Sequence, residues 1–204
     1  MNPGNQSTFA IIILAAGESN RMRIPKQLLP FRGKNMLQHA IDEASASQAD
    51  IVLAVLGANA ERIKRVLRTS RATLLMNPDW RQGISSSIRC GIKALPQSVD
   101  AVVISLCDQP HANTQIFNEL FAASRTTGKS IVACEYGGSS GTPALFSRVY
   151  FDQLLMLEGD RGAKKIIVEH TQDVARVPFA EGSIDIDTAE DYQQFMKNEL
   201  GIKN

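Results

Sequence analysis

The sequence predicts one α/β domain in which a mostly parallel β-sheet is covered by helices on both faces. Short runs that are apolar almost throughout alternate with longer segments whose apolar residues recur at helical spacing. Near-continuous apolar runs are typical of strands buried on both faces, as in parallel sheets. The 204 residues suit a single domain with a sizeable core, and no repeat, low-complexity tract or linker divides them.

The first half of the chain has the clearest alternation. Apolar runs predict four strands, over 9–14, 51–56, 73–76 and 101–106. The last of these looks the most central. Helical spacing predicts four helices, over about 35–47, 59–67, 83–95 and 114–124. Asn35 is expected to cap the first helix, and Ile63, Val66 and Leu67 are expected to face the core from the second.

The second half has shorter elements. Strands are predicted over 130–134 and 174–177, and a loop over 136–141. Two short helices are predicted, over 147–155 and 163–169. The last helix is expected to begin at Asp187-Thr188 and to turn Tyr192, Phe195 and Met196 inward.

Composition excludes several classes of protein. A net charge of +1 gives no electrostatic case for binding nucleic acid or a membrane surface. No apolar run is long enough to span a bilayer. Residues 1–8 are polar without a basic side chain, so we expect a disordered lead-in, not a signal peptide, before a domain over 9–204. Three widely separated cysteines argue against a disulfide framework or a structural zinc and fit the cytoplasm.

The segment after the first apolar run is the most informative. Leu14-Ala15-Ala16-Gly17-Glu18-Ser19 brings small residues and a glycine to a strand end, where the backbone can turn and approach a ligand. Arg21 and Lys26 follow with two positive charges. Bare amides with two cations suit a polyanion, and we expect a nucleoside triphosphate here. The glycine spacing fits neither a Walker loop nor a dinucleotide fingerprint.

Asp108 is the second candidate, because it directly follows the strand predicted over 101–106. Ligands of such sheets bind at the carboxyl ends of strands, so Asp108 should share an edge with the glycine loop. A carboxylate facing phosphates is well placed to hold Mg²⁺ or Mn²⁺. The alternative is that Asp108 merely caps the helix that begins near Asn113.

A second acidic cluster contains Asp185 and Asp187, which share a face if this segment is extended. One of them could complete a metal site with Asp108. The cluster is also a good acidic helix start, and both interpretations can hold together.

A loop that feeds a helix offers further polar groups. Asn77, Gly83, Ser85 and Ser86 could bind a base, a ribose or a phosphate through amides and hydroxyls. The alternative is plain helix capping by Ser85.

These segments together resemble one family. The chain reads Leu-Ala-Ala-Gly-x-Ser-x-Arg-Met and Pro-Lys-x-Leu-Leu-Pro, then Asn-Pro-x-Trp-x-x-Gly-x-Ser-Ser-Ser, Asp-Gln-Pro, Gly-Asp-x-Gly-Ala and Asp-Ile-Asp-Thr, in that order. This pattern resembles the nucleotidyltransferases of the molybdenum-cofactor cytidylyltransferase group, within the MobA-like NTP transferases. The resemblance implies a Rossmann-like fold of the nucleotide-diphospho-sugar transferase type.

The resemblance also implies roles for residues. Arg21, Lys26 and Asp108 would be catalytic, with Asp187 and then Asp185 as further metal ligands. The acceptor would be bound by Asp160 and Gly162 of Gly-Asp-x-Gly-Ala, and by Gly141, Thr142 and Pro143 of a further segment that resembles the family's Gly-x-Pro-x-Leu-Phe. For Gly141 to Pro143 a surface hairpin is the alternative, and for Asp160 a helix cap. Arg23 stands where the family usually has glycine, which alters the loop path or adds a third cation.

The implied reaction is transfer of CMP from CTP to the phosphate of molybdopterin, with release of pyrophosphate and possible delivery of the product to a molybdenum hydroxylase. Leu14-Ala15-Ala16-Gly17 favours CTP, because guanylyl relatives tend to read Leu-Ala-Gly-Gly. One alternative is a guanylyltransferase or a nucleotidyltransferase for sugar or polyol phosphates. Another is a non-catalytic carrier or chaperone of the molybdenum cofactor.

Overall fold

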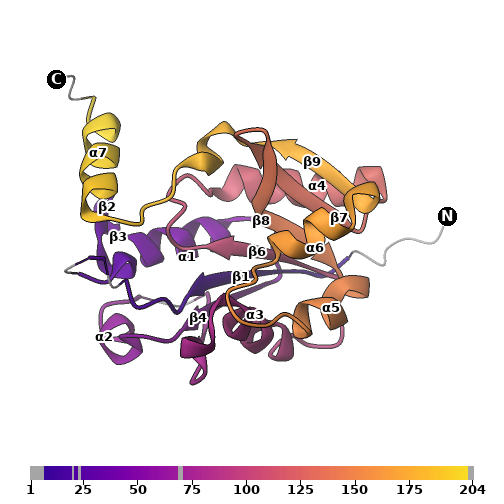
Figure 1. The fold of residues 1–204 in the computed structure, drawn as a ribbon, viewed down its shortest axis with the longest axis horizontal. Coiled ribbons are helices and arrows are strands. Elements are labelled where there is room, and N and C mark those ends of the chain that lie inside the picture. The colour runs from indigo at the N-terminus through magenta and orange to yellow at the C-terminus, as the bar shows by residue number, and fades with distance from the viewer. Residues whose placement is uncertain (1–6, 20, 23, 69–70, 202–204) are drawn as a thin grey trace.

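The computed structural model describes residues 7–19, 21–22, 24–68 and 71–201 (Figure 1). A seven-stranded sheet crosses the molecule in the order β5-β4-β1-β6-β8-β7-β9. Its strands are β1 (Phe9–Ala15), β4 (Ile51–Leu56), β5 (Thr73–Met76), β6 (Ala101–Leu106), β7 (Ile131–Tyr136), β8 (Ser139–Ser147) and β9 (Val174–Pro178). Every pairing is parallel except those of β8. The prediction of a mostly parallel sheet is confirmed, and β6 is its central strand.

Helices cover both faces of this sheet. On one face, α1 (Met36–Ala46), α2 (Ala60–Lys64) and α4 (Thr114–Thr127) contribute to one hydrophobic core. On the other, α3 (Ile84–Lys93), α5 (Phe151–Leu155) and α6 (Lys164–Glu169) contribute to a second. All seven residues of β1 are buried between these layers, and each large apolar side chain stabilises the fold by about 2 kcal/mol.

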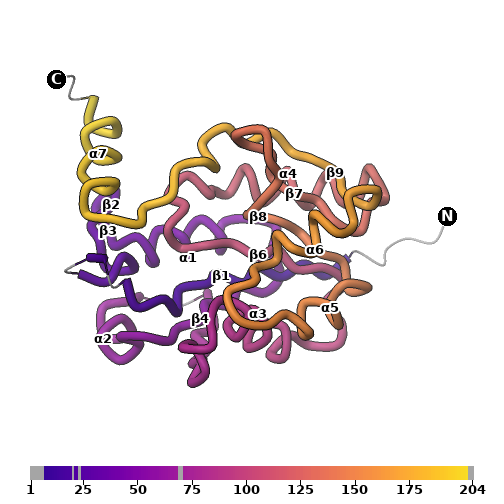
Figure 2. Tube along the Cα trace, viewed as in Figure 1, coloured from indigo at the N-terminus to yellow at the C-terminus, as the bar shows by residue number. Residues whose placement is uncertain are grey.

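A third, smaller core lies at one end of the molecule. The C-terminal helix α7 (Ala189–Glu199) packs there against the hairpin of β2 (Pro30–Phe31) and β3 (Lys34–Asn35). Figure 2 follows the chain from the far end of the sheet back to this place. Phe31 and Phe195 meet with ring centroids 5.2 Å apart. This packing holds the acidic segment before α7 beside the loop after β1.

Short 3-10 helices complete the fold: η1 (Lys26–Leu28), η2 (Trp80–Gln82), η3 (Arg148–Tyr150), η4 (Thr171–Asp173) and η5 (Ala180–Ser183). Asn35 caps α1 as predicted, since its side chain accepts the N–H of Gln38. Among the described residues, no helix has the length and apolar character that crossing a membrane requires.

Two predictions about elements are wrong. The stretch expected to be a loop belongs to a hairpin, and β8 runs from Ser139 through the segment of Gly141 to Pro143 as an interior strand between β6 and β7. The segment is part of a hairpin, but not the surface hairpin of the alternative, because β8 is a largely buried interior strand. The second helix ends at Lys64, so Val66 lies beyond it and is 51% exposed.

Candidate active site

The site is built where β1 and β6 end side by side. Leu14 pairs with Leu106 across these parallel strands, and the N–H of Cys107 donates to the carbonyl of Leu14 at 3.2 Å. The two loops therefore leave the same edge of the sheet, as predicted. A cavity of about 600 Å³ opens there, a size typical of small-molecule sites. Its lining comes from five segments of the chain: Leu14, Ala15, Ala16, Gly17, Glu18, Lys26, Gln27, Trp80, Arg81, Gly83, Ile84, Ser87, Leu106, Cys107, Asp108 and Asp160.

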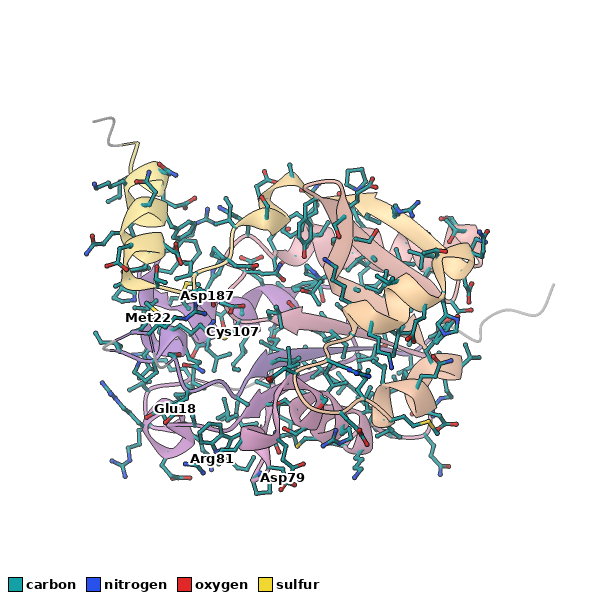
Figure 3. The ribbon with its side chains drawn as sticks, in the orientation of Figure 1. Glu18, Met22, Asp79, Arg81, Cys107 and Asp187 are labelled. Atoms are coloured by element: carbon teal, nitrogen blue, oxygen red, sulfur yellow. The ribbon has the colours of Figure 1, made fainter. Side chains whose placement is uncertain are left out.

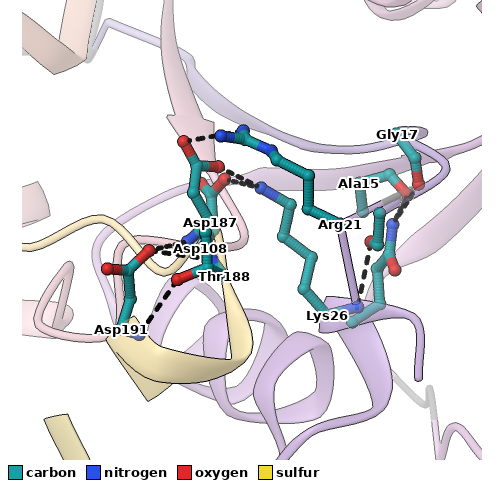
Figure 4. A network of polar contacts seen from close by, with 10 residues as sticks. Ala15, Gly17, Arg21, Lys26, Asp108, Asp187, Thr188 and Asp191 are labelled. Carbon is teal, nitrogen blue, oxygen red and sulfur yellow. Dashed lines mark hydrogen bonds and ion pairs between the residues drawn. The ribbon is translucent and has the colours of Figure 1, made fainter. Parts of the chain in front are cut away.

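Two cations and two carboxylates meet beside this cavity (Figure 4). The Lys26 ammonium bonds to Asp108 and lies 3.1 Å from Asp187. Arg21 lies 3.2 Å from the other oxygen of Asp187. The side chains of Lys26 and Asp108 are each only 16% exposed, so this is an enclosed ion pair. All four residues were predicted for the site, although up to 166 positions (187 − 21) separate them in sequence.

Charge perturbs the titration of this cluster. Burial opposes the charged form of Lys26, but the carboxylate of Asp108 outweighs it and raises the lysine pKa above its ordinary value. The hydrogen bond from Lys26 lowers the pKa of Asp187. Burial and the negative charges of Asp108 and Asp187 raise the pKa of Asp185 to about 6. Three carboxylates thus lie close enough to repel one another, with Lys26 as the compensating charge.

The carboxylates fit a divalent cation by their chemistry. Oδ1 of Asp108 is buried and has no hydrogen-bond partner in the described part of the chain. Carboxylate oxygens are the ligands that Mg²⁺ and Mn²⁺ prefer. With Lys26 seated between Asp108 and Asp187, no group of three or more His, Cys, Asp or Glu side chains among the described residues is arranged as a ready metal site.

One structural alternative at the cluster is wrong. Asp108 does not cap α4, because the side chain of Asn113 does so by accepting the N–H of Ile116. Cys107 lies in the cavity wall, and burial raises its pKa to about 12, so it remains a neutral thiol at pH 7.

The segment before α3 supports the cavity differently from expected. Asn77 is buried and its side chain donates to the hydroxyls of Ser86 and Ser87, at 2.9 and 3.0 Å. Ser85 is fully buried. Of the three serines in this segment only Ser87 lines the cavity, and Asn77 does not line it either. Capping by Ser85 is also wrong, because the cap residue is Gly83.

The five residues expected to bind the acceptor separate into two places. Asp160 lines the cavity beside Gly83, and it does not cap α6, whose cap residue is Ala163. Gly162 lies in the same loop, near Ile84. Gly141, Thr142 and Pro143 lie instead within β8, where the side chain of Gln109 donates to the carbonyl of Thr142 at 3.1 Å.

Sequence reasoning missed several residues of the cavity wall. The Arg81 guanidinium lies 4.2 Å from the ring centroid of Trp80. Figure 3 shows Arg81 and Glu18 toward one end of the site and Asp187 and Cys107 toward the other. Gln27 occupies the unspecified position of Pro-Lys-x-Leu-Leu-Pro, so the motif did not single it out. Arg23 and residues 1–6 are outside the described residues, so the expectations about them stay predictions.

A mostly parallel sheet with cations and carboxylates gathered beside a cavity at the carboxyl ends of its strands is typical of α/β proteins that bind phosphorylated ligands. Similarity to known proteins narrows this class. Residues 11–174 match the family described as the MobA-like NTP transferase domain. The chain belongs to this family of nucleotidyltransferases.

Individual relatives span almost the whole chain. The purine catabolism protein PucB of Bacillus subtilis is 29% identical, over 89% of this chain and 92% of that protein. The molybdenum cofactor cytidylyltransferase of Escherichia coli is 25% identical, over 91% and 94%. The structure of Rv0371c from Mycobacterium tuberculosis in complex with manganese superimposes with a TM-score of 0.81, at 25% identity over 94% and 99%. The expected divalent cation is thus confirmed for the family.

Proposed function

We propose that this chain transfers CMP from CTP to the terminal phosphate of a molybdopterin-type acceptor. The observation that carries the proposal is the cluster of Arg21, Lys26, Asp108 and Asp187 beside the glycine loop. A triphosphate and its cation bring both signs of charge, and the cluster offers partners for both. A protein that only bound a neutral ligand would gain nothing from enclosing Lys26 and Asp108, because burying charges is costly.

The roles follow from position. The exposed loop of Gly17, Glu18 and Ser19 offers backbone N–H groups to phosphate oxygens, and Arg21 and Lys26 add positive charge. Asp108 and Asp187, with Asp185 close by, would hold Mg²⁺ or Mn²⁺. When bound, this ion neutralises negative charge on the phosphates.

The reaction needs no nucleophile from the protein. An oxygen of the acceptor phosphate forms the new bond to the α-phosphorus of CTP, and the bond from that phosphorus to the bridging oxygen of the β-phosphate breaks. Pyrophosphate leaves with that oxygen. In-line displacement of this kind depends on positioning and on charge stabilisation. This agrees with a neutral thiol at Cys107.

Donor and acceptor are supported by similarity. Ala15-Ala16-Gly17 favours CTP, and a relative over most of the chain is named a molybdenum cofactor cytidylyltransferase. Delivery of the product to a molybdenum hydroxylase in the cytoplasm belongs to the same proposal. Unpaired thiols at Cys90, Cys107 and Cys134 support that compartment.

Pyrophosphate release tests the proposal. Native protein is mixed with Mg²⁺, molybdopterin and one nucleoside triphosphate, and pyrophosphate is measured. We expect release that requires both CTP and the pterin. Release with GTP, or with a sugar or polyol phosphate in place of the pterin, would identify one of the other transferases. Binding of the pterin without release from any triphosphate would indicate the carrier.

A further inference from the structure

Gln27 is a buried amide that contacts the backbone of the nucleotide loop. It lies in η1, directly after Lys26, and is 1% exposed. Its Nε2 donates to the carbonyl of Ala15 and to that of Gly17, both at 2.9 Å (Figure 4). Two carbonyl acceptors fix the orientation of this side chain, because only the NH₂ end of an amide can donate to both.

Three successive carbonyls of the loop, those of Ala15, Ala16 and Gly17, accept hydrogen bonds from the protein. The carbonyl of Ala16, between the two that Gln27 holds, accepts the N–H of Ala58 at 3.0 Å. The N–H groups of Gly17 and Glu18 share peptide planes with the carbonyls of Ala16 and Gly17 and point the other way. Neither they nor the N–H of Ser19 donate to an acceptor within the described ranges. These N–H groups belong to a loop that is exposed or half-buried at the cavity. Amides left in this way suit an anion.

The other end of the Gln27 amide indicates what the residue is for. Oε1 is buried and lacks a hydrogen-bond partner among the described residues. A buried acceptor without a partner destabilises a fold, and an apolar side chain of similar size would avoid that cost. The two donated hydrogen bonds are therefore the property that a glutamine supplies here and a methionine would not.

We propose that Gln27 is a positioning residue of the nucleotide site. It ties back the carbonyls of Ala15 and Gly17 and so sets the loop amides toward the triphosphate before the ligand arrives. Gln27 acts through the loop and not on the reacting atoms. The inference rests on the proposed function for the identity of the ligand, but the tie to the loop is a property of the ligand-free protein.

Amide hydrogen exchange of the ligand-free protein tests the tie by itself. In Gln27→Met, we expect faster exchange over residues 15–19 than in the native chain, because two hydrogen bonds that hold this segment are lost. Gln27→Asn has a shorter side chain that can reach at most one of the two carbonyls. Its exchange rate over residues 15–19 should lie between those of the native chain and Gln27→Met. This second variant keeps the test usable if Gln27→Met does not fold.

Gln38→Met is the matched control. Gln38 is also a buried glutamine, on α1, and its Nε2 donates to Asp42 and to the carbonyl of Arg68, at 2.8 and 3.1 Å. None of its hydrogen bonds reaches the loop, and it does not line the cavity. The control should lose stability without changing exchange over 15–19.

Binding measurements give the functional consequence. Calorimetric titration with CTP and Mg²⁺, and separately with inorganic triphosphate, should show about tenfold weaker binding for Gln27→Met and native affinity for Gln38→Met. In turnover, the KM for CTP should rise more than kcat falls. A loss of stability alone would weaken binding to the same extent in Gln27→Met and Gln38→Met.

The outcomes separate the two claims. Unchanged exchange over 15–19 in both Gln27 variants would overturn the positioning role, whatever the binding data show. Equal loss of affinity in Gln27→Met and Gln38→Met would overturn it as well. If native protein binds neither CTP nor triphosphate, the proposed function fails, and faster exchange in Gln27→Met alone would still support the tie to the loop.

Discussion

Lys26 sits between two carboxylates that come from distant parts of the chain, Asp108 after β6 and Asp187 before α7. Removal of either carboxylate would leave a less compensated charge in an enclosed place, which is costly. The same arrangement suits a ligand that carries both signs of charge. A metal-bound triphosphate offers anionic partners to Lys26 and a cationic partner to Asp108.

The role of Asp108 can be tested by Asp108→Asn, which keeps size and removes the charge. We expect turnover to fall by about a hundredfold or more at every Mg²⁺ concentration, the usual scale for losing a charge-stabilising group. The measurement is turnover across a Mg²⁺ titration. Asp50→Asn is the control, because Asp50 accepts the N–H of Phe9 at the opposite end of β1. Activity like that of the native protein throughout would refute the metal assignment.

Asp185 predicts how stability depends on pH in the absence of metal. Its pKa is raised from 3.8 to about 6. The ionised carboxylate therefore lowers the free energy of unfolding, fully above that pH and not at all below about 4. We expect Asp185→Asn to raise the free energy of unfolding by roughly 1 kcal/mol at pH 7.5. The full difference in pKa would give about 3 kcal/mol, but water screens this exposed residue.

Denaturant unfolding at several pH values measures this effect. The gain of Asp185→Asn over the native chain should fade as the pH falls through 6 toward 4. A variant that is less stable than the native chain at pH 7.5 would show that the carboxylate is not repelled in the fold.

At the scale of elements, α7 links packing to chemistry. The Thr188 hydroxyl accepts the N–H of Asp191, and the Asp191 carboxylate accepts the N–H of Thr188, which forms a capping box. The same carboxylate oxygen accepts the N–H of Asp187 at 3.2 Å. The start of α7 therefore orients the backbone of a proposed metal ligand.

Thr188→Ala should lower the free energy of unfolding by about 1 kcal/mol, the usual cost of losing a cap. It should also weaken the Mg²⁺ dependence of turnover, because Asp187 is the preceding residue. Asn113→Ala is the matched control, since Asn113 caps α4 and lies outside the ion cluster. Unfolding and Mg²⁺ titration are measured on both variants. Equal turnover in the two would contradict a link between α7 and the metal site.

The elements also show what a sequence can predict. The strands β1, β4 and β6 and the cap of α1 follow from local patterns, and the structure has them as predicted. Strand β8 does not, because Gly141 and Pro143 are typical of loops and only pairing with β6 and β7 makes this segment extended. Val66 is apolar at helical spacing, but its helix ends first.

The candidate site was likewise predictable only in part. Motif spacing predicted that Arg21, Lys26, Asp108 and Asp187 belong together. All three serines Ser85, Ser86 and Ser87 are buried, and motif spacing did not predict that only Ser87 lines the cavity, because that depends on how α3 is rotated against the sheet. The contacts of Gln27 depend on the path of the loop in three dimensions, which spacing does not contain.

For the whole molecule, the order of the strands brings the site together. The loop after β1 and Asp108 after β6 meet because these strands are parallel neighbours, and the packing of α7 on β2 and β3 brings Asp187 to them. The base is expected to be selected within the cavity that these segments enclose with Trp80 and Asp160.

Thermal unfolding with four nucleoside triphosphates and Mg²⁺ tests donor choice. A ligand that binds only the folded state raises the Tm by mass action. We expect the largest rise with CTP, because the loop reads Ala15-Ala16-Gly17. The corresponding turnover assay should prefer CTP to GTP. Use of GTP as well as or better than CTP would contradict the preference.

The central claim is that this site transfers a nucleotidyl group, and the fate of the α-phosphorus tests it most directly. CTP labelled at the α-phosphorus is mixed with molybdopterin, Mg²⁺ and the native protein, and the products are separated. The account predicts that the label moves into the pterin product while the released pyrophosphate is unlabelled. Bound pterin with all the label remaining in CTP, or label appearing in free CMP or CDP without a pterin product, would contradict it.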